Sequence, residues 1–220
     1  MLINNRIKAL IAAGVWTKLK ADYVLAAANA QAAQRNWKQD AYNLSEVSAP
    51  TFTADRGYQG NGTSSYLTSG TALNAITGLA QDSCALGVWS LTDASNSAYI
   101  DIGTLTSVSA YAIGRNAGGS LVVSSNAAGT DSTAVADSLG MYGWTRRAST
   151  DFDIIKNATV TNKVRASGGF SNGTFVVGTG GASFSARQIA VAFAASGLTA
   201  VEWAALRAAN LAYLQGVGAA

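Results

Sequence analysis

Residues 51–68 read TFTADRGYQGNGTSSYLT, and this stretch predicts the fold of the chain. Strand-forming residues at its two ends, 51–53 and 66–68, flank Gly57, Gly60 and Gly62, which tolerate the positive φ angles of tight turns. Short strands joined by glycine and small hydroxyl residues are typical of antiparallel β proteins. The stretch therefore predicts strands connected by tight turns near the start of an all-β domain.

Short extended segments separated by turn residues continue along the chain from Tyr42. They recur roughly every ten residues, which is the spacing expected of a β-sandwich. Further strands are predicted at residues 84–91, 98–102, 109–115, 121–124, 141–148, 151–155, 163–166, 174–178 and 183–194. We predict a two-sheet antiparallel jelly-roll sandwich.

Helices are predicted at both ends of the chain. Thr199 and Glu202 have the spacing of a capping box, so a closing helix is expected over residues 199–215. Near the start, apolar residues at helical spacing followed by Gly14 predict a helix over residues 3–13. We divide the chain into an N-terminal helical attachment arm, residues 1–40, and a jelly-roll domain, residues 41–220. The helices of the arm either pack on the sandwich as core or dock on other subunits.

Two passages of the chain resemble a known family. The pattern from Tyr58 to Leu67, with Gly60 and Gly62 between two tyrosines, is similar to a signature near the start of concanavalin A-like (laminin G-like) jelly-roll domains. The late strand followed by GLTAVE at 197–202 is similar to the passage that closes many of them. Closely similar passages occur in virion proteins of tailed bacteriophages. Residues 42–215 thus resemble a structural protein with a lectin-like fold.

This resemblance implies an exterior virion protein, either associated with the tail, fibre or baseplate or decorating the capsid. Its partners would then be other virion subunits, in a homo-oligomer or a larger assembly, and its location the virion. The alternative is a carbohydrate-binding module that recognises a glycan on the host surface. The scattered basic residues of the body do not favour nucleic acid as a partner.

Charge is distributed unevenly along the chain. Residues 1–38 hold six basic residues against Asp22 alone, a balance of +5, whereas the remaining residues have a balance of −2. A basic segment on a nearly neutral body indicates an acidic partner or, alternatively, the solvated face of an ordinary helix. The residues expected to make the attachment are Arg6, Lys8, Trp16, Lys18 and Lys20.

The chain contains no histidine, which excludes Ser-His and Cys-His nucleophile arrangements and the usual zinc ligand sets. Residues 169–173, GFSNG, fit the G-x-S-x-G pattern, but without a base Ser171 is an ordinary alcohol in a hairpin turn. Glu46 and Glu202 are the only glutamates. Asp151 and Asp153 are the best remaining carboxylate pair, and the preceding arginines favour a salt bridge over acid/base chemistry. We predict that the chain is not an enzyme and has no cofactor.

Ligand contacts are predicted on two kinds of residue. Aromatic side chains in the middle strands are candidate glycan contacts, namely Tyr99, Tyr111, Tyr142 and Trp144. Aromatic residues at such positions are more often core. The resemblance to lectin-like domains also leaves a structural calcium ion open, held by rim-loop oxygens among Asp93, Asn96, Asp101, Asp131 and Asp137.

The remaining composition excludes a membrane span and a disulfide within the chain. No apolar run approaches the ~18 residues that cross a bilayer, so we expect no membrane partner. Cys84 is the single cysteine and is expected to be a small buried hydrophobic residue.

Overall fold

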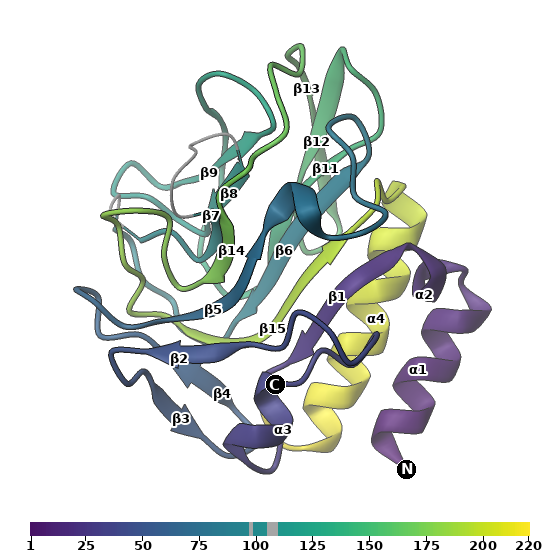
Figure 1. Ribbon diagram of the computed structural model, residues 1–220, viewed down its shortest axis with the longest axis vertical. Helices are drawn as coiled ribbons and strands as arrows, with labels where there is room; N and C mark the ends of the chain where they lie inside the picture. The colour runs from purple at the N-terminus through teal and green to yellow at the C-terminus, as the bar shows by residue number, and fades with distance from the viewer. Residues whose placement is uncertain (97–98, 105–109) are drawn as a thin grey trace.

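Two antiparallel sheets form a sandwich, with a helix near each end of the chain, which confirms the predicted fold class (Figure 1). The computed structural model describes residues 1–96, 99–104 and 110–220. Sheet A has the strand order β13 (Thr159–Val164), β12 (Asp151–Lys156), β11 (Gly140–Arg146), β6 (Cys84–Ser90), β15 (Gln188–Ala195), β4 (Gly57–Gln59) and β3 (Thr51–Thr53), and β1 (Leu19–Val24) also pairs with β15. Sheet B has the order β10 (Asp131–Ala134), β9 (Ser120–Ser125), β8 (Ala110–Ile113), β7 (Ile102–Thr104), β14 (Thr174–Val177), β5 (Tyr66–Ala72) and β2 (Ser45–Val47).

Four α-helices accompany the two sheets among the described residues. They are α1 (Leu2–Ala12), α2 (Val15–Lys18), α3 (Ala30–Gln34) and α4 (Ala200–Gly216), with a short 3₁₀ turn at Leu73–Ala75. Three of them, α1, α2 and α4, contact one another. Helix α4 begins with the capping box that the sequence predicts: Thr199 Oγ1 accepts from the Glu202 amide, and Glu202 accepts from the Thr199 amide. Helices α1 and α4 lie side by side over the outer face of sheet A (Figure 1). No helix among the described residues is both long and apolar enough to cross a membrane.

Sheet A is buried on both of its faces. Its inner face packs against sheet B, where side chains such as Leu86, Trp144 and Phe175 meet. Its outer face packs against the helices through Trp89, Phe193 and other apolar residues. The central strands β6, β11 and β15 are therefore buried almost throughout, without the alternation expected when one face meets solvent.

The stretch 51–68 crosses from one sheet to the other. Strands β3 and β4 form a hairpin in sheet A, and β5 belongs to sheet B, between β14 and β2. Between them Asn61 Oδ1 accepts hydrogen bonds from the amides of Thr63, Ser64 and Ser65, at 2.9, 2.9 and 3.0 Å, which fixes the turn. Gly57 has φ +102°, and a Cβ there would lie 2.1 Å from the Ile189 carbonyl oxygen. Glycine is therefore required where β4 meets β15.

Several predicted boundaries differ from the structure. Residues 19–24 form β1 and not a continuation of the N-terminal helices, because they pair with residues 191–195 of β15, a contact that local sequence does not reveal. The strand predicted at 163–166 lies earlier, at Thr159–Val164, because Asn157 and Ala158 make a tight hairpin turn after β12. The strand β10 was not predicted. The predicted starts at Ala98 and Ser109 lie outside the described residues.

Residues 1–40 take part in the sandwich as well as flanking it, because β1 is a strand of sheet A. Their role in attachment to a partner stays a prediction. Cys84 lies fully buried, and burial raises the pKa of its thiol to about 12 although Asn126 acts in the opposite direction. Its predicted place in the core is confirmed.

Candidate functional site

A polar cleft opens where the last strand of sheet A and the last strand of sheet B lie at the same side of the sandwich. We call it the edge cleft, and its volume is about 270 Å³. Its walls come from β10 and the segment after it and from the β12–β13 hairpin, and they consist of Thr133, Ala134, Val135, Ala136, Asp137, Lys156, Asn157, Thr159 and Thr161. The hydroxyls of Thr133 and Thr161 lie 3.2 Å apart and join the two sheets at this edge.

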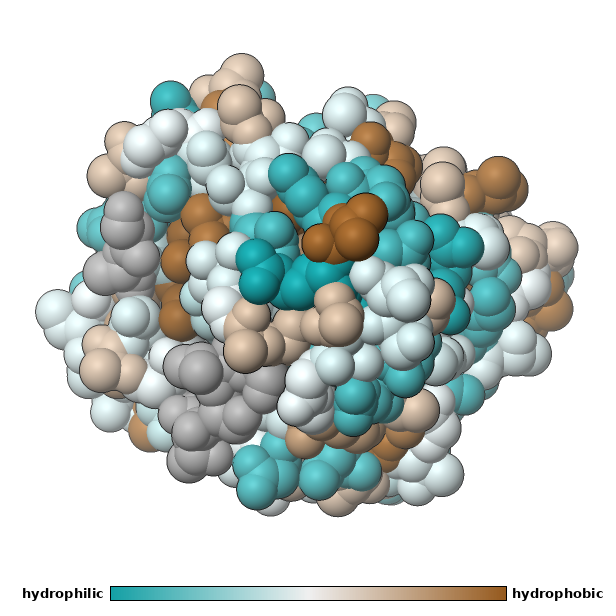
Figure 2. Space-filling model, turned by 90° about the horizontal axis from the view of Figure 1, so that it is seen from above, coloured by the Kyte–Doolittle hydropathy of each residue, from teal (hydrophilic) through white to brown (hydrophobic). Residues whose placement is uncertain are grey.

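The walls of the edge cleft are polar because β10 and β13 are edge strands of their sheets, and an edge strand is less covered than a central one. Strand β13 reads TVTNKV and β10 reads DSTA, so neither supplies a continuous apolar face. Figure 2, a view from above, shows a surface of small mixed patches, hydrophilic and hydrophobic, rather than one large hydrophobic face. The polar composition of these two short segments is the signal that would have marked them as edges.

Charged groups of the edge cleft form one ion pair. Lys156 Nζ donates to Asp137 Oδ1 at 3.0 Å and also to the Leu139 carbonyl oxygen. Burial raises the pKa of the Asp137 carboxyl, but the hydrogen bond and charge of Lys156, the Leu139 amide and the charge of Arg115 together outweigh it and hold this pKa below its usual value of 3.8. Burial lowers the pKa of Lys156, and Asp137 opposes that change. The Asp137 side chain remains 42% exposed, so the ion pair faces solvent.

Asn157 is held in a fixed orientation beside this pair. Its backbone has φ +55°, as the tight turn between β12 and β13 demands, and its Oδ1 accepts from the Met141 amide at 3.0 Å. Gly140 makes this approach possible, because a Cβ at residue 140 would lie 2.3 Å from Asn157 Oδ1. The edge cleft thus presents an ammonium, an amide and threonine hydroxyls from the β12–β13 hairpin, opposite a carboxylate and a threonine hydroxyl from β10 and the segment after it.

The predicted glycan contacts do not form one surface. Tyr142 and Trp144 are fully buried between the sheets, so their prediction as surface contacts is wrong. Burial, more than the charge of nearby Asp101, raises the pKa of Tyr142, and its hydroxyl donates to Asp101 Oδ2 at 2.9 Å. Tyr99 and Tyr111 are half-buried. The Tyr99 ring covers the Arg187 guanidinium at 5.2 Å, whereas Tyr111 belongs to β8 and pairs with Gly103 of β7.

The predicted attachment residues have partners within the chain. Arg6 is buried and makes two hydrogen bonds of 2.7 Å to Asp22, so it does not face a partner. Lys18 donates to Glu202 at 2.7 Å. Lys20 donates to the Thr17 carbonyl, and Trp16 lies under the Lys38 ammonium. Lys8 is exposed. Much of the positive charge of residues 1–38 is therefore neutralised internally or used in packing.

The aspartates among the candidate calcium ligands have partners within the chain. Asp101 forms a fully buried ion pair with Arg187, and Asp131 and Asp137 pair with Arg165 and Lys156. Asp93 accepts from the Ser138 amide. Among the described residues no group of three histidine, cysteine, aspartate or glutamate side chains has the arrangement of a metal site. A structural calcium ion, with Asn96 among its candidate ligands, stays a prediction.

The rejected catalytic motifs are also explained by their contacts. The Ser171 hydroxyl is buried and donates to Thr104 Oγ1 at 3.0 Å. Arg147 and Asp153 form the predicted salt bridge at 2.9 Å. Glu202 caps α4. These side chains are all engaged in structural contacts.

The chain shares its fold with domains of glycosidases. Domain 4 of AbnA, an extracellular GH43 arabinanase from Geobacillus stearothermophilus solved in complex with arabinotriose, matches with a TM-score of 0.59 at 11% identity, over 86% of this chain and 98% of that one. A mutant of Trypanosoma rangeli sialidase with trans-sialidase activity matches with a TM-score of 0.59 at 12% identity, over 91% of this chain and 33% of that one. Trypanosoma rangeli sialidase itself matches with a TM-score of 0.53 at 14% identity.

These likenesses establish a β-sandwich of the kind found in such enzymes, and the chain spans about a third or less of the sialidase chains. The sequence matches no protein-family model and no curated protein. The prediction that the chain is not an enzyme is contradicted, because the solved structures that share its fold come from an arabinanase and from sialidases. The absence of histidine excludes Ser-His and Cys-His nucleophile arrangements and the usual zinc ligand sets. It does not distinguish this chain from enzymes that contain a domain of the same fold.

Proposed function

We propose that this chain is a carbohydrate-binding β-sandwich module and that its edge cleft holds a neutral saccharide. The observation that carries the proposal is the set of hydrogen-bonding groups in the edge cleft. A carboxylate, an ammonium and an amide stand together at the solvent-facing edge, and neighbouring sugar hydroxyls are both donors and acceptors. Arabinotriose in the complex of the similar arabinanase domain supports the same class of ligand.

A neutral saccharide fits the edge cleft better than an acidic one. Lys156 is the one cation among the described residues that line the cleft, and Asp137 already neutralises it. A carboxylate on the ligand would compete with Asp137 for Lys156 and would leave one of the two anions without a partner. We therefore expect arabinose oligosaccharides to bind in preference to sialylated glycans.

Isothermal titration calorimetry with arabinotriose and with 3′-sialyllactose tests this proposal. We expect arabinotriose to bind at least about tenfold more tightly than 3′-sialyllactose, and we expect Asp137→Asn and Lys156→Met each to weaken it about tenfold or more, because each removes a charge-assisted hydrogen bond. Asp40→Asn removes an exposed carboxylate elsewhere and should leave binding unchanged. Absence of binding to either saccharide, or equal binding by wild type and both cleft variants, would refute the proposal.

A structural role in a bacteriophage virion stays a prediction from the two end passages. Its partners would be other virion subunits, and its attachment segment residues 1–40. The exposed members of that segment, and not buried Arg6, would have to make the contact. Incorporation of a Lys8→Glu variant into particles is the measurement that bears on it, and undiminished incorporation would remove Lys8 from the attachment set.

A further inference from the structure

A second hollow surface lies over the outer face of sheet A, the face that points away from sheet B. It runs along α1 and α4. Four of the eight large hydrophobic side chains that are exposed among the described residues belong to residues 1–11, namely Met1, Leu2, Ile3 and Ile11. Exposed apolar side chains scattered singly need no explanation, whereas a concentration on one helix marks a contact surface.

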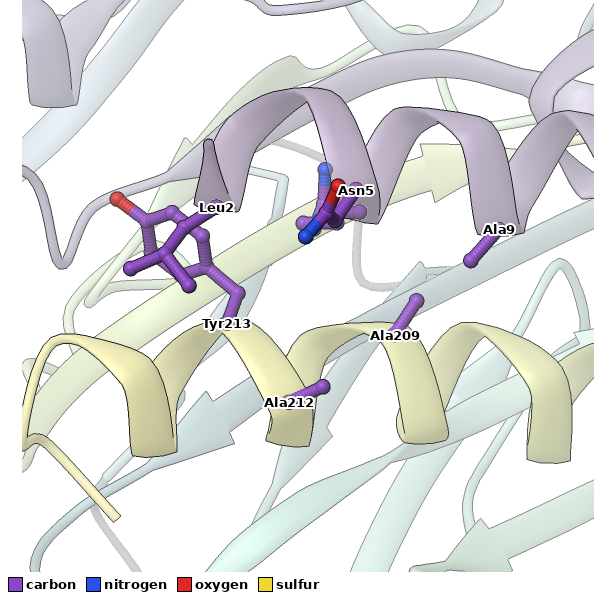
Figure 3. Close-up of a pocket in the computed structure, with 7 residues that line it drawn as sticks. Leu2, Asn5, Ala9, Ala209, Ala212 and Tyr213 are labelled. Carbon is purple, nitrogen blue, oxygen red and sulfur yellow. The ribbon is translucent and has the colours of Figure 1, made fainter.

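Two adjoining hollows form what we call the N-terminal groove. The first, of about 170 Å³, lies between α1 and α4 and is lined mainly by Leu2, Asn5, Ala9, Ala209, Ala212 and Tyr213. Figure 3 shows Leu2 beside the Tyr213 ring at one end and Ala9 facing Ala209 at the other. The second hollow, of about 350 Å³, shares Leu2 and Tyr213 with the first and extends past Trp37 to Asp55. The alanines leave room between the helices for side chains of another molecule.

Asp55 is the one carboxylate among the described residues that line the groove. It is half-buried, and its amide donates to the Ala27 carbonyl oxygen at 2.9 Å. In the described part of the chain its carboxylate has neither an ion pair nor a hydrogen bond, although exposed Arg56 follows it directly. Asp55 and Tyr213 line the same hollow. Burial raises the pKa of Tyr213, and the Asp55 charge raises it further. A carboxylate that lies against apolar side chains loses part of its hydration, and a cation bound beside it would compensate for this loss.

The aromatic walls suit a cation with an aliphatic stem. Trp37 already receives the Arg6 guanidinium at 5.6 Å from its ring, and Asp22 neutralises that guanidinium. The edge of Tyr213 meets Trp37 with ring centroids 5.7 Å apart. A lysine or arginine side chain packs its methylene groups on such rings and carries its charge to a carboxylate.

We propose that the N-terminal groove binds a peptide segment of a partner protein, with aliphatic residues between α1 and α4 and a lysine or arginine side chain at Asp55. Charge complementarity at Asp55 selects this occupant over an acidic segment, and the apolar walls select it over a saccharide. The site is separate from the edge cleft, which belongs to the other end of sheet A.

Two capped peptides probe the groove, Leu-Ala-Lys-Ile-Ala-Leu and the same peptide with norleucine in place of lysine. Norleucine keeps the aliphatic stem and lacks the charge. Titration into the full chain, followed by calorimetry, should show the lysine peptide binding at least about tenfold more tightly. Asp55→Asn should abolish this difference. Asparagine tolerates the φ of +59° at residue 55, so the variant should fold.

Control variants separate the groove from general effects of charge. Asp151→Asn removes a carboxylate at the start of β12 and should keep the preference for the lysine peptide. Ala28→Trp fills the larger hollow, whose wall includes exposed Ala28, and should abolish binding of both peptides. Equal affinity of wild type for the two peptides, no binding of either, a preference that survives Asp55→Asn, or displacement of the peptide by arabinotriose would each overturn the proposal.

Discussion

Replacing Arg6 by methionine should strongly destabilise the protein. Arg6 and Asp22 have completely buried side chains, and Arg6 donates two hydrogen bonds of 2.7 Å to the Asp22 carboxylate and one of 2.8 Å from Nε to Asn210 Oδ1. Methionine keeps most of the apolar volume, but it leaves the Asp22 carboxylate buried without its counter-ion. Removing one partner of a buried ion pair typically costs about 3 to 5 kcal/mol. We expect a loss of that size, measured as the free energy of unfolding in urea by tryptophan fluorescence.

A matched exposed pair provides the control. Arg35 and Asp40 are 2.8 Å apart, but their side chains are 53% and 83% exposed. Arg35→Met should therefore lower the free energy of unfolding far less than Arg6→Met does, because solvent screens the pair and hydrates the carboxylate that remains. The double variant Arg6→Met with Asp22→Leu should recover most of the lost free energy of unfolding, since neither residue then leaves a buried charge at this position. A loss for Arg6→Met below about 1 kcal/mol would refute this reasoning.

Two further predictions concern a turn glycine and a helix cap. Gly57→Ala should lower the free energy of unfolding by at least about 3 kcal/mol, because its Cβ would lie 2.1 Å from the Ile189 carbonyl oxygen. Gly70 also has a positive φ, but a Cβ there would have no atom within 4 Å, so Gly70→Ala should cost about 1 to 2 kcal/mol. Thermal unfolding compares the two, and equal losses would contradict a steric cause. Burial raises the pKa of Glu202, but hydrogen bonds from Lys18 and Thr199 outweigh it and hold this pKa below its usual value of 4.5. The stabilisation from Glu202 is thus complete above about pH 4.5 and is lost as the pH falls through the lowered value. Urea unfolding of wild type and Glu202→Gln at pH 7, 5, 4 and 3 should show a difference that shrinks only in acid, and a difference independent of pH would show that the charge contributes nothing.

Local chemistry made part of the fold predictable. The turn around Asn61 and the capping box of Thr199 and Glu202 depend on residues a few positions apart, so their pattern in the sequence is sufficient. Strand β1 could not be found in this way. Asp22 within it is compatible with the sheet only because Arg6 covers it from α1, and its pairing partner lies near the other end of the chain.

The candidate site was less predictable than the fold. Tyr142 and Trp144 are candidate glycan contacts from the sequence alone, with a place in the core as the alternative, and the structure has the alternative. Tyr142 and Trp144 are two positions apart on β11, so they share one face, and this is the inner face that packs against sheet B. The sequence of a single strand does not show which of its faces is the inner one. Likewise Asp137 and Lys156 are 19 positions apart and come together only because β10 and β13 are both edge strands.

The pairing of β1 with β15 determines the order in which this protein can complete its folding. Leu19 pairs with Ala195, so during synthesis residues 19–24 have no sheet partner until β15, more than 160 positions later, has left the ribosome. Sheet B and the β11–β13 part of sheet A can form before then, from contacts closer in sequence. Because such a long loop closes slowly, we expect residues 19–24 to join the sandwich after those contacts have formed, with their backbone amides and carbonyls unpaired until then.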